Sequence, residues 1–94
     1  MDNKALASML RLLATERRVT ILRMLLDSPE PLPSSTIASL LGVEDGPASY
    51  NLTELAESGL IKRQQSGRWV FYTPNRELLA KVFEIFAPQQ MENP

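Results

Sequence analysis

The chain has 94 residues and a formal net charge of −1, and it contains neither cysteine nor histidine. This composition excludes disulfides, thiolate metal ligands and thiol redox chemistry, and it removes the commonest metal ligand and general base. With 44% hydrophobic and 22% charged residues, the length and composition predict one globular domain.

The N-terminal segment predicts two helices rather than one, although residues 4–27 contain no Gly or Pro. The first apolar stripe consists of Leu6, Met9, Leu10 and Leu13. The second consists of Val19, Leu22, Leu25 and Leu26. Because the second stripe is rotated by about half a turn at ~100° per residue, we place a break near Thr15, which can cap the second helix.

The middle of the chain predicts two short helices joined by a turn. Three prolines within residues 28–33 indicate an extended connector. Ser34 or Ser35 can cap a third helix, which buries Ile37, Leu40 and Leu41 and ends at Gly42. Pro47 suits the first turn of a fourth helix, with Asp45 or Gly46 as its cap. That helix buries Leu52, Leu55 and Ala56 and ends at Gly59.

A hairpin and a last helix complete the domain. Residues 60–64 and 68–73 predict two strands around a turn at 65–67. Alternation in the second strand places one face on the helices, with Trp69 and Phe71 expected in the core or an interface. Pro74 and Asn75 then open a helix that Pro88 ends. Its apolar residues are Leu78, Leu79, Val82, Phe83 and Phe86.

The order of elements predicts a mainly α fold: four helices, a β-hairpin and a final helix. The third and fourth helices form a helix-turn-helix, and the hairpin is its wing. We expect one domain over residues 1–87 and a flexible tail over 88–94. No apolar stretch approaches the roughly 18 residues of a membrane span, so we expect a cytoplasmic protein without membrane contact.

Two long segments together resemble the ArsR-type (ArsR/SmtB) winged helix-turn-helix transcriptional regulators. The segment ATERRVTILRMLL is similar to the family's second helix. The segment IASLLGVEDGPASYNLTELAESGLIKRQQSGRWVFYTP aligns without gaps to its helix-turn-helix and wing. The resemblance covers roughly residues 5–86 and implies a DNA-binding dimer.

The chain departs from the family in two ways. At the start of the fourth helix, which the resemblance makes the recognition helix, Ser49 matches the usual pattern. Tyr50 and Asn51 replace a basic residue and a His. The cysteines and histidines through which many members sense metals are also absent, so metal sensing does not transfer, and we expect no metal and no cofactor.

Candidate DNA contacts lie on the recognition helix and the wing. The helix has four acidic residues between Glu44 and Glu57 and no Lys or Arg, so DNA phosphates would repel it. Polar side chains can still contact base edges. The candidates on the helix are Ser49, Tyr50, Asn51 and Thr53, and those on the wing are Lys62, Arg63 and Arg68. By resemblance, Arg68 reaches the minor groove. The alternative is that the helix is merely polar and the wing charges are merely solvated.

The terminal helices carry more apolar surface than a small monomer can easily cover, so they predict a dimer interface. In the family, these two helices form the dimer. The candidate interface residues are Leu6, Met9, Leu10, Leu13, Leu78, Leu79, Val82, Phe83 and Phe86.

These observations favour a homodimeric, sequence-specific regulator that binds double-stranded DNA at an inverted repeat, as a repressor or autoregulator without a metal. The alternative is a winged-helix dimerisation or protein-interaction module that does not bind DNA, which the acidic recognition helix favours. We do not expect an enzyme, because the usual nucleophile–base pairs need His or Cys.

Overall fold

The computed structural model describes residues 1–87. Within them, five helices and three strands follow in the order α1 (Asn3–Leu13), α2 (Glu16–Asp27), β1 (Leu32–Pro33), α3 (Ser34–Leu41), α4 (Asp45–Glu57), β2 (Ile61–Ser66), β3 (Trp69–Pro74) and α5 (Arg76–Glu84). This is the predicted winged helix-turn-helix order. The expected tail over 88–94, and Pro88 as the end of the last helix, lie outside the described residues. Regular helix in α5 ends at Glu84, before Phe86.

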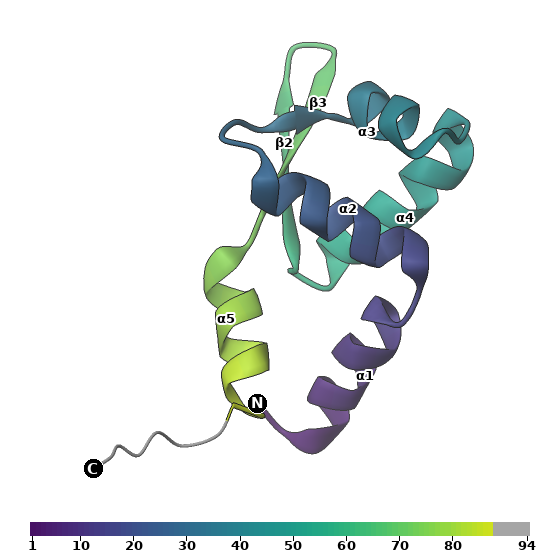
Figure 1. Cartoon of the computed structure of the whole chain (residues 1–94). Coiled ribbons are helices and arrows are strands. Elements are labelled where there is room, and N and C mark those ends of the chain that lie inside the picture. The colour runs from purple at the N-terminus through teal and green to yellow at the C-terminus, as the bar shows by residue number, and fades with distance from the viewer. Residues whose placement is uncertain (88–94) are drawn as a thin grey trace.

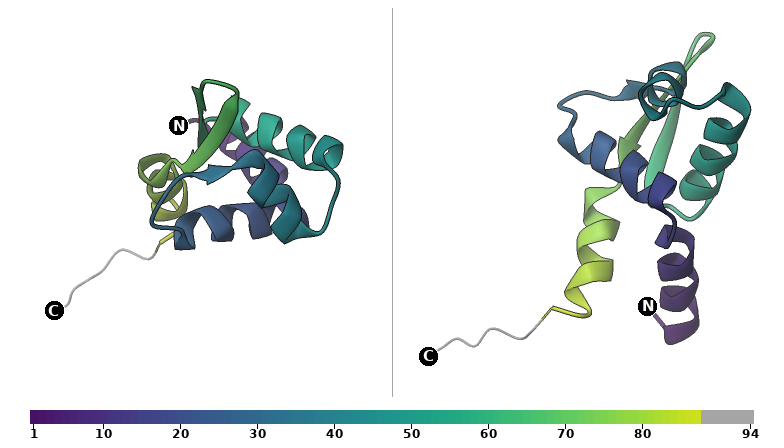
Figure 2. Two further views of the ribbon diagram at one scale, coloured as in Figure 1. Left: turned by 90° about the horizontal axis from the view of Figure 1, so that it is seen from above. Right: turned by 45° about the vertical axis from the view of Figure 1, so that its right-hand side comes forward.

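The elements form a helical body with projections at opposite ends (Figure 1). Helices α2, α3 and α4 pack around the base of the sheet. The β2–β3 hairpin extends from one end, whereas α1 and α5 extend from the other, and a second side view confirms this arrangement (Figure 2). The wing and the two terminal helices therefore lie on opposite sides of the helical body.

Helix caps explain most of the boundaries. Thr15 caps α2 as predicted, since its hydroxyl accepts a hydrogen bond from the Arg18 amide at 3.3 Å. Gly42 ends α3 in the left-handed conformation, with φ of 72°, also as predicted. The caps predicted for α3 and α4 are wrong. Each helix starts earlier than expected, so Pro33 and Glu44 occupy the N-cap positions and neither gives a side-chain cap.

The sheet has a third strand that the sequence did not predict. In the expected connector, Leu32 pairs with Tyr72 and Pro33 with Phe71, which gives the strand order β1-β3-β2. A two-residue edge strand has no periodicity to detect, and proline is tolerated there because an edge residue can leave one side unpaired. This strand fixes the start of α3 against the wing.

The wing turn is tighter than predicted. Ser66 pairs with Trp69, so the strands continue to a two-residue loop of Gly67 and Arg68. Gly67 has φ of 62° and Arg68 does not have a positive φ, which is the pattern of a type II′ turn. Arg68 therefore lies at the tip of the hairpin rather than in the returning strand.

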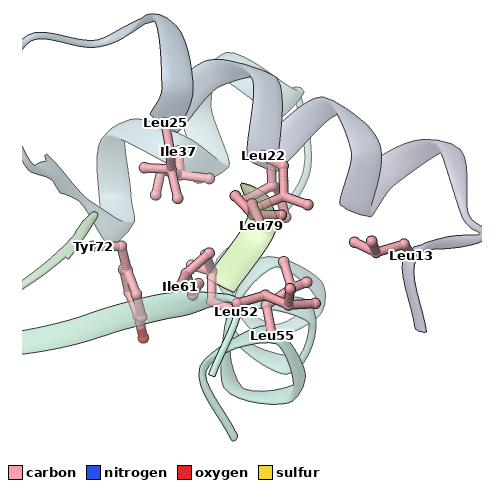
Figure 3. Packing of buried hydrophobic residues seen from close by; sticks show 11 residues of the cluster. Leu13, Leu22, Leu25, Ile37, Leu52, Leu55, Ile61, Tyr72 and Leu79 are labelled. Atoms are coloured by element: carbon pink, nitrogen blue, oxygen red, sulfur yellow. The ribbon is translucent and has the colours of Figure 1, made fainter. Parts of the chain in front are cut away.

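The core lies between α2, α3, α4 and the sheet (Figure 3). Its largest fully buried side chains are Ile21, Leu25, Ile37, Leu52, Leu55, Leu60 and Ile61. Three predicted core positions are wrong: Val19, Leu26 and Leu40 are exposed, and Leu40 retains 63% of its surface. Helix α2 is contacted by α1, α3, α4 and β3 together, so its buried residues are the predicted Leu22 and Leu25 and, in addition, Ile21.

The inward face of β3 also differs from the expectation. Tyr72 is buried and Val70 half-buried, whereas Trp69 is exposed and Phe71 half-buried. Pairing with β1 on one side and β2 on the other decides which residues of β3 lie under the helices.

Candidate nucleic-acid interface

Helix α4 presents a polar face with three of the predicted contact residues. Ser49, Tyr50 and Thr53 are exposed, while Leu52 and Leu55 on the opposite face are fully buried in the core. Ser49 and Thr53 lie four residues apart, so they are neighbours on one side of the helix. The chain thus offers hydroxyl groups, rather than cations, along the exposed side of α4.

Asn51 does not belong to that face, which corrects the sequence-based expectation. Only 8% of its surface is exposed. Its Oδ1 accepts a hydrogen bond from Arg18 Nε at 3.0 Å, and its Nδ2 donates to the Pro47 carbonyl at 2.9 Å. Both ends of the amide are thus engaged inside the protomer, so Asn51 is not free to pair with a base in this conformation.

Arg18 connects three helices, and the sequence did not single it out. From α2 its guanidinium donates through Nη1 to the Leu12 carbonyl near the end of α1, at 3.0 Å, as well as to Asn51 on α4. Its Cζ also lies 5.9 Å from the centroid of the Tyr50 ring, within the range of a cation–π contact. Arg18 therefore sets the position of α4 relative to the N-terminal helices.

The wing carries the predicted basic residues in three different settings. Lys62 and Arg63 are exposed neighbours on β2, so their side chains leave opposite faces of the hairpin. Arg63 pairs directly with Tyr72 on β3, and directly paired residues lie on the same face of a sheet. Arg68 is exposed at the tip, beyond the strands.

A cavity of about 320 Å³ separates α4 from the wing. It brings together three predicted contact residues, Ser49, Thr53 and Arg63. Tyr50, Lys62 and Arg68 do not line it. Its other polar lining residues are Ser34 and Ser35 at the start of α3, Asp45 at the start of α4, and Tyr72, and none of them was predicted as a site residue. The four-residue spacing of Ser49 and Thr53 was a signal for one wall, but the opposite wall depends on tertiary structure.

The sequence of the chain is similar to those of known helix-turn-helix proteins. Residues 6–64, more than half of the chain, match the model of a family described as a helix-turn-helix domain. Over 60 residues the chain is 38% identical to a Halobacterium salinarum protein named for the arsenical resistance operon repressor ArsR, covering 64% of this chain and 46% of that one. The chain belongs to the ArsR-type family of winged helix-turn-helix regulators. It spans about half the length of the curated relatives it matches.

Solved structures of similar proteins agree with this assignment. HlyU from Vibrio cholerae is 32% identical, with a TM-score of 0.72, over 89% of this chain and 91% of that one. The homodimeric winged helix-turn-helix DNA-binding domain of Mb0332 from Mycobacterium bovis is 28% identical, with a TM-score of 0.73, over 88% and 75%. The predicted fold class is therefore confirmed for this ArsR-type chain.

The candidate dimer residues of this ArsR-type chain separate into two groups. Leu6, Leu13, Leu79 and Val82 are already buried within one protomer, which corrects their assignment to exposed stripes. Met9, Leu10 and Leu78 are half-buried. Phe83 and Phe86 retain 55% and 63% of their surface, and Ile85 beside them is also exposed. Among these candidates, the exposed apolar surface is therefore concentrated at the end of α5.

Two further properties of this ArsR-type chain concern only residues 1–87. No helix in that range has the length and apolar character needed to cross a membrane. In the same range, no three acidic side chains come close enough together to form a metal site, and the chain has no Cys or His.

Proposed function

We propose that this chain is a homodimeric transcriptional regulator that binds double-stranded DNA sequence-specifically, rather than an enzyme. The main support is the placement of Ser49 and Thr53 across one cavity from Arg63. A polar helix face beside a basic hairpin suits base contacts from the helix and phosphate contacts from the wing. The Mb0332 domain, of similar fold, is described as homodimeric and DNA-binding, which also supports the proposal.

Helix α4 and the wing differ in charge, and this difference assigns them different proposed contacts to DNA. Helix α4 has acidic residues at Asp45, Glu54 and Glu57 and no basic residue. Phosphate neutralisation therefore comes from the wing, chiefly from Arg63 and Arg68, with Lys62 as a weaker candidate. Ser49, Tyr50 and Thr53 are the proposed contacts to base edges and sugars. Asn51 is left out because its amide is engaged inside the protomer.

We further propose that the dimer forms through α1 and α5, as a repressor or autoregulator that needs no metal. The two helices extend from the end opposite the wing, so a two-fold dimer built there leaves both α4 helices exposed (Figures 1 and 2). Two recognition helices then suit an inverted repeat with half-site centres about 10 bp apart, or a multiple of that spacing.

Fluorescence anisotropy with duplexes from upstream of the chain's own gene, and with scrambled duplexes, tests this proposal. Arg68→Ala is expected to weaken binding to all sequences. It is also expected to reduce the slope of log affinity against log salt concentration by about one unit for each phosphate that it leaves without a cation. Thr53→Ala removes a single hydroxyl and is expected to cost about 0.5–1.5 kcal/mol on the preferred duplex only. Arg11→Ala removes an exposed arginine of α1, outside the proposed DNA contacts, and it serves as the control.

A second candidate is an interaction module that dimerises or binds a protein and does not bind DNA. The acidic character of α4 is the observation that favours it. If no upstream duplex binds even at low salt, this second candidate replaces the first.

A further inference from the structure

Tyr72, a largely buried residue, lines the cavity between α4 and the wing, and its hydroxyl has no partner within residues 1–87. Tyr72 is only 5% exposed, and its hydroxyl makes no hydrogen bond to any residue in 1–87. Figure 3 shows the ring at the edge of the core with its oxygen pointing away from the other labelled side chains. Tyr72 lines the cavity. A buried phenol usually has a hydrogen-bond partner, so this hydroxyl is available to a polar group that enters the cavity.

The other groups around the cavity also have unused hydrogen-bonding capacity. The hydroxyls of Ser34, Ser35, Ser49 and Thr53 form no hydrogen bond within the described part of the chain. Helix α3 begins at Ser34 after a proline, which cannot supply a side-chain cap, so its first amides lack a side-chain acceptor. A helix N-terminus of this kind attracts negative charge.

The charges at the cavity show which kind of ligand fits. Arg63 supplies a guanidinium from the wing, and its planar set of donors matches the oxygens of a phosphate. Asp45 lines the same cavity and opposes an anion there. The remaining polar groups are hydroxyls and amides, which donate to phosphate oxygens without adding charge. The volume of about 320 Å³ is near the lower limit for ligand pockets and leaves room for a phosphate with an attached sugar.

The position of the cavity agrees with that chemistry. The major and minor grooves of DNA are separated by one sugar–phosphate backbone. If α4 lies in the major groove and the wing tip at the adjacent minor groove, a backbone strand must pass between them. The cavity lies between these two elements.

We propose that this cavity is a sugar-phosphate site, in which Tyr72, Arg63 and the uncapped start of α3 bind one phosphate with its attached sugar. The DNA backbone would supply this group, and this version of the proposal rests on the proposed function. A free sugar phosphate has the same chemistry and would compete with DNA for the site. The site therefore contributes to DNA affinity or makes it responsive to a small phosphorylated molecule.

The first experiment does not depend on DNA. The ¹⁵N-labelled full chain is titrated with inorganic phosphate and with ribose 5-phosphate, at constant ionic strength. We expect saturable shifts of the Ser34 and Ser35 amides. Tyr72→Phe is expected to weaken this binding by roughly tenfold, as for loss of a hydrogen bond to a charged group. Ser39→Ala, which removes an exposed hydroxyl of α3 outside the cavity, is the matched control and is expected to bind as the wild type does.

Two further pairs of variants make the test specific. Arg63→Gln is expected to weaken binding, whereas Arg23→Gln, which alters an exposed arginine of α2 outside the cavity, is expected to leave it unchanged. Asp45→Asn is expected to strengthen binding, which a purely structural role would not predict. Tyr72→Phe is expected to fold with an equal or higher melting temperature, because the hydroxyl it removes has no partner within residues 1–87.

The second experiment identifies the source of the phosphate. Single neutral methylphosphonates are placed in turn along an upstream duplex. If the DNA backbone supplies the phosphate, a methylphosphonate at one position in each half-site weakens binding by the wild type. On that modified duplex, Tyr72→Phe causes no further loss of affinity. If a free sugar phosphate is the ligand, ribose 5-phosphate binds much more tightly than inorganic phosphate and displaces the duplex from the protein. Saturable phosphate binding without any DNA binding would support the site and contradict the proposed function. Shifts confined to Lys62 and Arg68, with Tyr72→Phe equal to the wild type, would overturn the proposal.

Discussion

Replacing Asn51 by alanine distinguishes a structural role from a DNA contact. In the structure the amide links α4 to Arg18 on α2 and to the Pro47 carbonyl one turn earlier. Asn51→Ala is therefore expected to lower the stability of the fold and to leave base preference unchanged. A residue that pairs with adenine would give the reverse result.

The magnitude follows from the two hydrogen bonds. The bond from Arg18 is charge-assisted, but Arg18 is half-buried, so we take about 1.5 kcal/mol, the low end for such bonds. The neutral bond to Pro47 contributes about 1 kcal/mol. The higher helix propensity of alanine offsets about 0.5 kcal/mol of this loss. The net destabilisation is about 2 kcal/mol, or roughly 8–16 °C in melting temperature for a domain of this size.

Thermal and urea unfolding, followed by circular dichroism, measure this change. All variants are compared at one protein concentration, because dimer dissociation makes the melting temperature depend on concentration. Thr53→Ala is the control, since it alters an exposed residue of the same helix and is expected to change stability by less than about 0.5 kcal/mol. In a double-mutant cycle, Arg18→Ala and Asn51→Ala should show a coupling of about 1 kcal/mol or more.

The assignment would be refuted by a specific combination of results. If Asn51→Ala unfolds within about 0.5 kcal/mol of the wild type and loses preference at a single base pair, the amide contacts DNA and its hydrogen bonds in the protomer add nothing measurable.

Three other predictions concern the caps, the dimer and metals. Gly42→Ala is expected to destabilise the fold by about 1 kcal/mol through backbone strain alone, because a Cβ there meets no atom within 4 Å. Gly46→Ala, equally open but inside α4, is expected to stabilise the fold by about 0.5–1 kcal/mol, and thermal unfolding measures both changes. Phe83→Asp is expected to yield a monomer in sedimentation, whereas Trp69→Asp, at an equally exposed aromatic on the wing, is expected to remain dimeric; a monomeric wild type would contradict the dimer. Micromolar zinc is expected to leave the melting curve and DNA affinity unchanged, and a calorimetric binding signal with loss of DNA affinity would contradict a metal-independent mechanism.

The sequence alone determined the order and approximate extent of the helices and the hairpin. Apolar periodicity, the break at Thr15 and the glycines at 42 and 59 are local signals, and local hydrogen bonds and backbone sterics act on them directly. The family resemblance, the wing and the polar residues of the recognition helix were accessible for the same reason.

Tertiary structure alone decided which side of each element is buried. Asn51 is one residue away from exposed Tyr50, and its inward orientation depends on Arg18, 33 residues earlier in the chain. The exposed position of Leu40 and the pairing of Leu32 with Tyr72 depend equally on distant partners. The cavity between α3, α4 and the wing is also formed by segments that are separate in sequence. Burial and hydrogen-bond partners are properties of contacts between elements, and periodicity within one element does not specify them.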